Sequence, residues 1–397
     1  MCARARQRAA RAGGGGRLTA AGPRARGRIL RAVSDRPERP LITAIEAVLP
    51  PLLSTLERVT WVQRHLDPTV AGRLADALAP CAPGLETARR ALESQRGEEE
   101  LEFLRERLVQ VAGQTLELVT AFVAAARDGG DPFDLYRALR RFARIQEALY
   151  PVAPVVDAVS RWFLEPDRRF DDALVERLRE GAMRDAGSRV GVLHADNERD
   201  ERGGCSLYVP ETWDGRAPLP LVVALHGGHG HGRDFLWSWL RDARARGVLV
   251  LAPTSLDRTW SLMGEDVDGA PLLQIVEHVA TRYPVDRTRM LVTGMSDGAT
   301  YALRCGAREG TPFTHLALLC GVVHPMVVAD GGLERLRERP VYHVHGALDW
   351  MFPVATARFG RDLLLDAGAR VVYRELDDLS HTYPRDENPR ILDWLLA

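Results

Sequence analysis

The sequence predicts an all-helical region followed by an α/β domain with a mostly parallel, doubly wound sheet. From about Gly187 onward, short β-rich apolar runs alternate with helix-compatible segments, the pattern of successive strand–helix units. Residues 41–185 instead carry apolar side chains at intervals of three and four, as amphipathic helices do. One apolar run, Met290–Thr293, leads into the segment Gly294-Met295-Ser296-Asp297-Gly298. Such a Gly-x-Ser-x-Gly segment is typical of a sharp strand-to-helix turn.

Length and composition allow two or three domains with a large core. The chain has 397 residues, of which 46% are hydrophobic. The 53 basic and 54 acidic residues leave a net charge of -1, which argues against general nucleic-acid binding. Every basic residue is arginine, so a Schiff-base lysine and a P-loop lysine are excluded. No apolar run approaches the ~18 residues of a membrane helix, and we expect no membrane span.

The cysteines indicate a reducing compartment. They are odd in number, widely spaced and without a Cys-x-x-Cys pair: Cys2, Cys81, Cys205, Cys305 and Cys320. This pattern predicts neither a disulfide scaffold nor a zinc site. We therefore expect a cytoplasmic location.

Residues 1–40 are predicted to be a disordered basic tail. They contain eleven arginines and two acids, a local charge of 11 − 2 = +9, and the glycine run Gly13–Gly16. The stretch lacks the continuous apolar core of a secretory signal. An organelle transit peptide stays open as an alternative, although the glycine run interrupts any amphipathic helix. A mis-started N-terminus is the simpler interpretation.

Residues 41–186 are predicted to form a helical domain. One apolar stripe consists of Leu101, Leu104, Leu108, Val111, Leu118 and Phe122, with Thr115 as its polar exception. A second stripe consists of Leu135, Leu139, Phe142, Ile145 and Leu149. It follows Asp131-Pro132, which is typical of an N-cap with proline at the first helical position. Shorter helix candidates are Leu41–Leu56 and Thr69–Leu78. Because its apolar stripes must be buried, we expect this domain to pack beside a functional site or to mediate homodimerisation. It contains no catalytic constellation, so we do not expect it to carry out chemistry.

Residues 187–397 are predicted to form the α/β domain. The expected strands are Val190–His194, Ser206–Val209, Leu221–Leu225, Gly247–Ala252, Arg289–Thr293, His315–Cys320, Val341–His345 and Val371–Leu376. Helical stretches such as Pro271–Arg282 and Ala355–Ala367 lie between several of them. The first two strands are close enough in the chain to form an antiparallel hairpin at the edge of the sheet. Ligands of such sheets bind beyond the carboxyl ends of the strands.

Reactive residues follow four of the expected strands. The loop His226-Gly227-Gly228-His229-Gly230 comes after Leu221–Leu225, and Ser296 comes after Arg289–Thr293. A carboxylate, Asp349, and an imidazole, His381, follow the last two strands. Separations of 349 − 296 = 53 and 381 − 349 = 32 residues leave room for the intervening elements. A donor loop, a hydroxyl, a carboxylate and an imidazole are therefore expected at one edge of the sheet.

In this order the motifs resemble those of the α/β-hydrolase superfamily. The matching segments are Leu207–Pro210, Leu221–Gly228, Gly294–Gly298, His345–Asp349 and Ser380-His381. They fall in about half of the chain, from Gly187 to Ala397. Within the superfamily the chain is similar to the serine esterase branch that contains phospholipase/carboxylesterases, polyhydroxybutyrate depolymerases and feruloyl esterases. The resemblance implies an α/β-hydrolase fold and a small-molecule ester substrate, without a metal or organic cofactor.

The resemblance also implies roles for individual residues. Ser296 would be the nucleophile, His381 its base, and Asp349 the group that orients the imidazole. The backbone N–H groups of Gly228 and Asp297 would form the oxyanion hole. Two positions depart from the pattern of this branch, since Asp297 replaces a Gln, Ala or Met and Ala299 replaces a frequent third glycine. A carboxylate at Asp297 would oppose negative charge on the oxyanion unless it points away.

Other residues near these motifs have competing interpretations. His229, Trp260 and Trp350 are candidate substrate contacts, while aromatic residues beside motif loops are more often part of a core. His226, His229 and His231 could suggest a metal cluster, although Asp234 is the only nearby acid. His226 is expected to brace the oxyanion turn instead.

Further polar residues in the α/β domain have structural interpretations. His324 precedes Asp349 in the chain and is out of order for the base. His343 and His345 are expected to be core histidines with their hydrogen bonds satisfied. Asp377 and Asp378 are expected either to support the site or to be solvated.

Three functions are consistent with these residues. The leading hypothesis is a serine esterase that cleaves carboxylic esters through an acyl-enzyme. The same triad could serve a thioesterase or a peptidase, because the serine motif does not distinguish leaving groups. A non-catalytic binding or scaffold protein derived from a hydrolase is a further alternative, and a complete triad argues against it.

Overall fold

The computed structural model describes residues 19–20, 39–97, 99–129, 131–185 and 189–397. The chain divides into two compact units. The first holds the described residues from Arg39 to Asp185. The second holds those from Arg189 to Ala397 together with Thr19 and Ala20.

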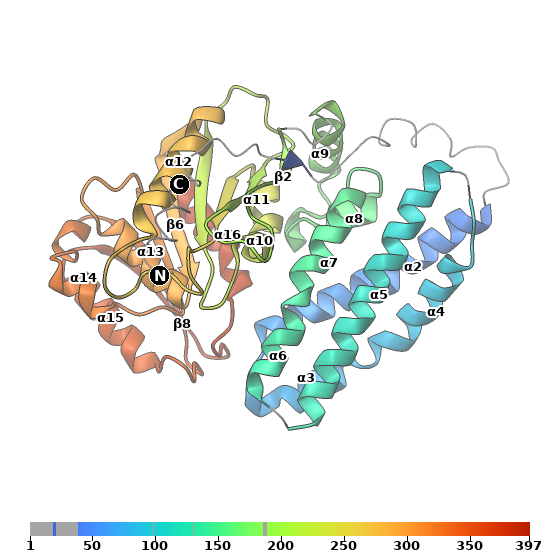
Figure 1. The fold of residues 1–397 in the computed structure, drawn as a ribbon, viewed down its shortest axis with the longest axis horizontal. Helices are drawn as coiled ribbons and strands as arrows, with labels where there is room; N and C mark the ends of the chain where they lie inside the picture. The colour runs from blue at the N-terminus through green and yellow to red at the C-terminus, as the bar shows by residue number, and fades with distance from the viewer. Residues whose placement is uncertain (1–18, 21–38, 98, 130, 186–188) are drawn as a thin grey trace. The chain divides into compact units, whose positions relative to one another are not determined.

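The first unit is all-helical, as the apolar periodicity predicts (Figure 1). Its α-helices are α2 (Arg39–Arg64), α3 (Ala71–Leu78), α4 (Cys81–Glu93), α5 (Glu99–Arg127), α6 (Pro132–Leu139), α7 (Arg141–Leu149), α8 (Asp157–Trp162) and α9 (Asp172–Asp185). Three 3₁₀ turns lie between them: η2 (Pro68–Val70), η3 (Tyr150–Val152) and η4 (Pro166–Arg168).

The predicted apolar stripes lie in the core of this helical unit. On α5, the side chains of Leu108, Val111, Leu118 and Phe122 are all 0% exposed. Thr115 is buried among them and donates its hydroxyl to the carbonyl of Val111 at 2.7 Å, which satisfies the one polar group of the stripe.

The start of α6 matches its predicted cap. Asp131 accepts the N–H of Phe133 at 2.9 Å, and Pro132 is the first helical residue. The side chain of Asp131 thus satisfies one of the N–H groups that a helix N-terminus leaves without a partner.

Two helices of this unit have the length and apolar composition of a membrane span, over Pro40–Arg64 and Leu101–Arg127. Core helices of water-soluble bundles share these properties, and 39% of each apolar window is buried inside the protein. The absence of a membrane span therefore stays a prediction.

Most of the predicted basic tail lies outside the described residues. Its exceptions are Thr19 and Ala20, which form a short strand, and Arg39 and Pro40, which belong to α2.

The second unit is built on one sheet with strands β1 (Thr19–Ala20), β2 (Gly191–Ala195), β3 (Cys205–Val209), β4 (Leu219–Leu225), β5 (Leu249–Pro253), β6 (Val285–Met295), β7 (His315–Leu319), β8 (Pro340–Gly346) and β9 (Arg370–Leu376). The order is β1-β2-β3-β5-β4-β6-β7-β8-β9. Pairing is antiparallel from β1 to β5 and parallel from β5 to β9. Each predicted strand overlaps an observed one, and the predicted antiparallel hairpin is β2–β3. Its predicted place at the edge of the sheet is wrong, because β1 pairs with β2 and forms that edge. This arrangement is an α/β-hydrolase fold.

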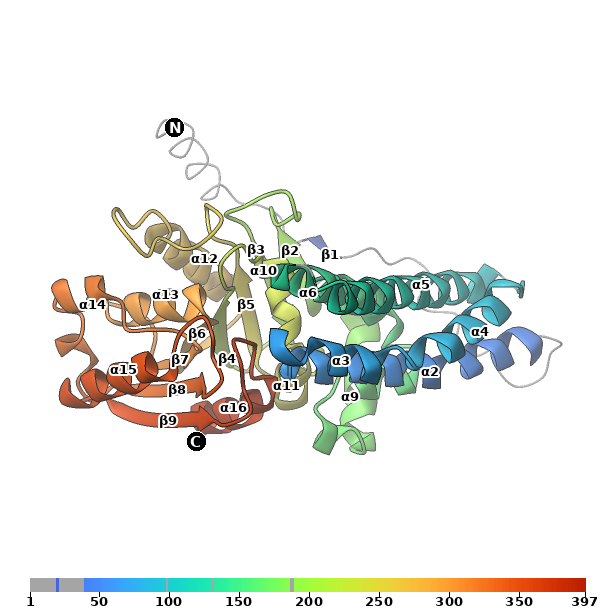
Figure 2. The same ribbon diagram turned by 90° about the horizontal axis from the view of Figure 1, so that it is seen from below.

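Helices cover both faces of the sheet (Figures 1 and 2). They are α10 (Gly232–Phe235), α11 (Leu240–Arg246), α12 (Gly269–Arg282), α13 (Asp297–Gly306), α14 (Pro325–Ala329), α15 (Val354–Asp366) and α16 (Asn388–Leu396), with 3₁₀ turns η5 (Leu236–Ser238), η6 (Glu334–Leu336) and η7 (Arg385–Glu387). Alternate residues of the central strands share one buried cluster with apolar residues of α12, α13 and α15. On the other face, α11 and α16 pack side by side.

The parallel strands place the predicted reactive loops together. Leu225, at the end of β4, is in register with Gly294 on β6, and Gly294 is in register with Leu318 on β7. Parallel neighbours end at the same edge of a sheet, so the loops after β4, β6, β8 and β9 emerge at one edge.

A buried ion pair supports this unit beside β3. Arg244 and Glu211 have side chains only 1% and 3% exposed, and Arg244 Nε lies 3.0 Å from Glu211 Oε1. The hydroxyl of Tyr208 donates to the other carboxylate oxygen at 2.6 Å. Such a pair is stable only while both charges are present, because an unpaired buried charge keeps its full desolvation cost.

We predict that Arg244→Met lowers the free energy of unfolding by about 3–5 kcal/mol, because it removes one charge of a pair in which both charges are buried. Arg287→Met is the matched control, since Arg287 pairs with Glu277 at the surface with both side chains at least half exposed, and should cost about 1 kcal/mol or less. Urea denaturation measures both variants. Equal losses in the two would contradict the prediction.

Candidate active site

The centre of the site is the turn between β6 and α13. Ser296 is the N-cap residue of α13 and has φ 55° and ψ −121°, a combination that a non-glycine residue rarely adopts. Its N–H donates to Leu319 O at 2.9 Å, and its carbonyl accepts the N–H of Thr300 at 3.0 Å. Bonds on both sides of the residue hold the strained backbone, which leaves the Ser296 side chain partly exposed.

The glycines on either side of Ser296 are required by close backbone contacts, as the motif predicts. A Cβ on Gly294 would lie 2.4 Å from the carbonyl carbon of Gly298 and 2.7 Å from Leu225 O. A Cβ on Gly298 would lie 2.2 Å from Leu225 O and 2.5 Å from His226 O. Real Cβ atoms do not approach backbone oxygens this closely, so the turn packs against the end of β4 only with glycine at both positions.

The structure brings together the three predicted triad side chains. His381 Nε2 lies 3.0 Å from Ser296 Oγ, although the two residues are 85 apart in the chain, and His381 Nδ1 lies 2.8 Å from Asp349 Oδ2. A carboxylate only accepts, so Nδ1 carries the proton and Nε2 is left to accept the serine proton. Asp349 and His381 are 5% and 4% exposed. The geometry is that of a nucleophile, a base and an orienting carboxylate.

Asp349 is fixed by its own loop. Its Oδ1 accepts the N–H groups of Met351 at 3.0 Å and of Phe352 at 2.8 Å. The ring of Phe352 contacts the ring of His381 edge to face, with centroids 5.3 Å apart. The imidazole is therefore held both by the carboxylate and by an aromatic side chain from the same loop. The sequence does not predict the contact between Phe352 and His381, because no motif places an aromatic residue at this distance after Asp349.

The loop after β4 is braced by His226, as predicted. The N–H of Ser255 donates to His226 Nε2 at 3.1 Å, so the ring proton is on Nδ1, which donates to Gly227 O at 2.8 Å. Trp260 Nε1 donates to the carbonyl of His226 at 2.8 Å. These bonds fix the glycine loop beside the turn of Ser296, where a Cβ on Gly227 would lie 3.6 Å from Ser296 Cβ.

The two predicted oxyanion donors lie beside each other. Among the described residues, no hydrogen bond uses the backbone N–H of Gly228 or of Asp297. A Cβ on Gly228 would lie 2.7 Å from Asp297 Oδ2, so the carboxylate lies alongside this glycine. The hydroxyl of Thr259 donates to the same oxygen at 2.6 Å. A hydrogen bond to the charged form disperses its charge, which limits the repulsion that this carboxylate would exert on an oxyanion.

The three candidate substrate contacts lie in different surroundings. Trp260 is 3% exposed and stacks on Tyr301 with ring centroids 5.2 Å apart, so it supports the glycine loop from the core and does not form a wall of the site. His229 is exposed, with φ 57°, and its N–H donates to Arg258 O at 2.8 Å. Trp350, next to Asp349, is 44% exposed.

The remaining histidines of the loop and of α14 have structural partners. His231 Nε2 lies 2.9 Å from Glu201 O, its Nδ1 accepts the N–H of Arg233, and burial lowers its pKa. His324 Nδ1 accepts the N–H of Met326 and caps α14. Within the described residues, no group of three or more His, Cys, Asp or Glu side chains could hold a metal ion.

Burial decides between the interpretations of two further pairs of residues. Asp377 and Asp378 are exposed beyond the end of β9. His343 and His345 are buried, at 1% and 0% exposure, as predicted. The expectation that their hydrogen bonds are satisfied is wrong for both, because among the described residues neither ring nitrogen of His343 has a partner and Nδ1 of His345 has none.

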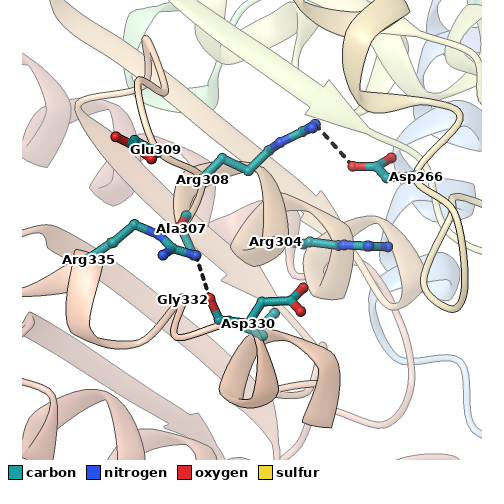
Figure 3. Close-up of a pocket in the computed structure, with 9 residues that line it drawn as sticks. Asp266, Arg304, Ala307, Arg308, Glu309, Asp330, Gly332 and Arg335 are labelled. Carbon is teal, nitrogen blue, oxygen red and sulfur yellow. Dashed lines mark hydrogen bonds and ion pairs between the residues drawn. The ribbon is translucent and has the colours of Figure 1, made fainter.

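A separate cavity of about 350 Å³ lies at the C-terminal end of α13, whereas Ser296 lies at its N-terminal end (Figure 3). Its charged lining residues are Asp266, Arg304, Arg308, Glu309, Asp330 and Arg335. Arg308 pairs with Asp266 at 3.0 Å, while Arg304 and Arg335 donate to backbone carbonyls. Three positive and three negative groups favour no ligand charge, and no triad residue lines this cavity.

No protein-family model matches this chain, and no curated protein matches it in sequence. Solved structures similar to it include a thermostable esterase (21% identity, 49% of this chain, TM-score 0.40), the fluorophosphonate-binding serine hydrolase F of Staphylococcus aureus (14%, 52%, 0.44) and an acetyl xylan esterase from Aspergillus awamori (15%, 52%, 0.41). The matches cover 58%, 97% and 98% of those chains. The fold assignment rests on the strand order and the serine turn.

We predict that Gly298→Ala strongly destabilises this unit, because the new Cβ would be forced against Leu225 O at 2.2 Å. The loss should be about 2 kcal/mol or more, in the range of backbone strain and overpacking. Gly113→Ala on α5 is the control, since a Cβ there meets nothing within 4 Å and alanine is the better helix former. Thermal unfolding compares them. A Gly298→Ala protein as stable as the control would show that the turn can relax.

Proposed function

We propose that this protein is a serine esterase that cleaves carboxylic esters through an acyl-enzyme intermediate. The observation that carries the proposal is the continuous hydrogen-bonded chain from Ser296 Oγ through His381 to Asp349, at 3.0 and 2.8 Å. It stands at a strained strand-to-helix turn, where the serine side chain stays accessible. Strain kept at such a position supports a functional role, since the fold would otherwise be more stable without it.

In acylation, Ser296 Oγ attacks the ester carbonyl carbon while its proton moves to His381 Nε2. The imidazolium that forms is stabilised by the Asp349 carboxylate, which keeps the ring in the orientation required for transfer. The tetrahedral intermediate then breaks the bond to the alcohol oxygen, and Nε2 returns the proton to that oxygen. The alcohol leaves and the acyl group stays on Ser296.

In deacylation, water takes the position of the alcohol. His381 Nε2 accepts a proton from water while the water oxygen attacks the acyl carbon. The second tetrahedral intermediate then breaks its bond to Ser296 Oγ, which takes the proton back from Nε2, and the carboxylic acid leaves. Each step uses side chains of this unit alone, and the base returns to its neutral form after every cycle.

The negative charge of both intermediates requires donors that are already in place. The N–H groups of Gly228 and Asp297 are suited to this role, because both are unused within the described residues and lie beside the serine turn. Asp297 is also the first residue of α13, where a helix N-terminus favours negative charge. A donor of this kind contributes about 2.7–4 kcal/mol to transition-state stabilisation.

The finer assignment is to the branch containing phospholipase/carboxylesterases, polyhydroxybutyrate depolymerases and feruloyl esterases, which the order of the motifs supports. The free thiols of Cys81, Cys205, Cys305 and Cys320 are compatible with a cytoplasmic location. Esters of graded acyl length, together with matched thioesters and amides, would establish which leaving groups the site accepts.

We predict that Ser296→Ala lowers kcat for activated esters by roughly 10⁴–10⁶ with little change in stability. Nitrophenyl ester hydrolysis measures the loss, and a fluorophosphonate probe should label the wild-type protein but not this variant, because only an activated serine reacts. Ser54→Ala is the control, since Ser54 is exposed on α2. Labelling or turnover retained in Ser296→Ala would mean that another residue is the nucleophile.

A second prediction concerns the oxyanion donors. Gly228→Val should lower kcat/KM on the order of 100-fold or more, because its Cβ would meet Asp297 Oδ2 at 2.7 Å and displace the loop. The double variant Gly228→Val/Asp297→Ala should recover part of the loss, since the clashing carboxylate is absent. If folded Gly228→Val protein has wild-type kinetics, the donor lies elsewhere.

A further inference from the structure

His345 lies directly behind the proposed triad. It is the next-to-last residue of β8, and its side chain is 0% exposed. Its Nε2 lies 2.8 Å from the carbonyl oxygen of Phe352 and 3.4 Å from Asp349 Oδ2. A carbonyl oxygen only accepts, so Nε2 carries a proton and donates it to Phe352.

The His345 ring is a neutral donor. Burial lowers its pKa, and a second proton on Nδ1 would have no acceptor among the described residues. The titratable groups that face it are Asp349, His381, Glu375 and His343. Burial lowers the pKa of His343 to about 3, and Glu375 is paired with Arg358. Because the His345 ring is neutral, it does not compete with His381 for an ion pair with the Asp349 carboxylate.

The bond from His345 closes the loop that carries the triad carboxylate. The first half of this loop is tied to neighbouring strand ends, since Ala347 N–H donates to Leu376 O at 2.9 Å and Leu348 N–H donates to Leu379 O at 3.0 Å. The second half returns to β8 through the bond between His345 and Phe352.

Two contacts to His381 depend on this second half. Asp349 Oδ1 is held by the N–H groups of Met351 and Phe352, which leaves Oδ2 directed at His381 Nδ1. The Phe352 ring meets the imidazole edge to face. Displacement of the Phe352 backbone would therefore move both the carboxylate and the ring away from the base.

We infer that His345 is a positioning residue: its Nε2–H anchors the Phe352 carbonyl to β8 and thereby holds Asp349 and the Phe352 ring against His381. The inference rests on the proposed esterase function. A displacement of about 1 Å among catalytic groups can cost on the order of 100-fold in rate. Complete loss of the orienting carboxylate costs about 10⁴, so the effect of His345 should fall below that limit.

The test compares three substitutions of His345 with one control. His345→Leu removes the donor and keeps an apolar side chain in the core. His345→Gln places an amide N–H near the position of Nε2, whereas in His345→Asn the amide stays near that of Nδ1 and falls short of Phe352. His343→Leu is the control, because His343 is equally buried on β8 but its ring packs on Tyr373.

For nitrophenyl ester hydrolysis by the full chain, His345→Leu and His345→Asn should lower kcat about 10- to 100-fold with KM changed less than about threefold. His345→Gln and His343→Leu should stay within about threefold of the wild type. The strongly deshielded proton resonance of the His381–Asp349 hydrogen bond should weaken in the Leu and Asn variants and persist in the Gln variant. If the role of His345 were purely structural, all four variants would lose stability, and kcat would not separate His345→Leu and His345→Asn from His345→Gln and His343→Leu.

Equal kinetics in the Gln and Asn variants would overturn the inference, and so would wild-type kcat in folded His345→Leu protein. If His345→Leu does not fold, the kcat values of His345→Gln and His345→Asn still test the inference. The proposed function fails separately, because a wild-type protein that neither hydrolyses esters nor reacts with a fluorophosphonate probe would contradict it whatever the His345 variants do.

Discussion

The backbone conformation at Ser296 is the constraint on which the rest of the site depends. A left-handed φ at a serine is stable only because β6, α13 and the end of β4 meet at this point. Gly294 and Gly298 allow that meeting, since any side chain at either position would strike the backbone of Leu225 or His226. The same close contact sets the glycine loop after β4 beside the serine. One steric requirement thus fixes the proposed nucleophile and the proposed oxyanion donors together.

Three histidines of the site show how a hydrogen-bond partner selects the role of an imidazole. His226 accepts at Nε2 from a backbone N–H and donates from Nδ1, which braces a loop. His345 donates from Nε2 to a carbonyl. His381 faces a carboxylate at Nδ1, so its Nε2 carries no proton and accepts from Ser296. Only this last arrangement leaves a basic nitrogen directed at a hydroxyl, which is what general base catalysis requires.

The sequence predicts the fold and the meeting of Ser296, Asp349 and His381 well, because each rests on a local signal. Strand–helix alternation, the glycines around Ser296 and the position of Asp349 and His381 after strands are all visible in the chain. The burial of Trp260 and the bond from His345 to Phe352 depend on how distant segments pack, and no local pattern encodes them. The surroundings of Asp297 can be predicted only in part. The sequence predicts that it lies beside the glycine loop after β4, but not that its carboxylate accepts a hydrogen bond from Thr259.

The separation of the proposed triad in the chain has a consequence for when during folding these three side chains meet. Ser296 and His381 are 85 residues apart, and Asp349 and His381 are 32 apart. Such contacts of high sequence separation form late, because they close long loops. An intermediate with β4, β6 and β7 assembled would already contain the serine turn but not its base. Regain of the proposed esterase activity is therefore a more stringent reporter of complete refolding in this unit than recovery of secondary structure.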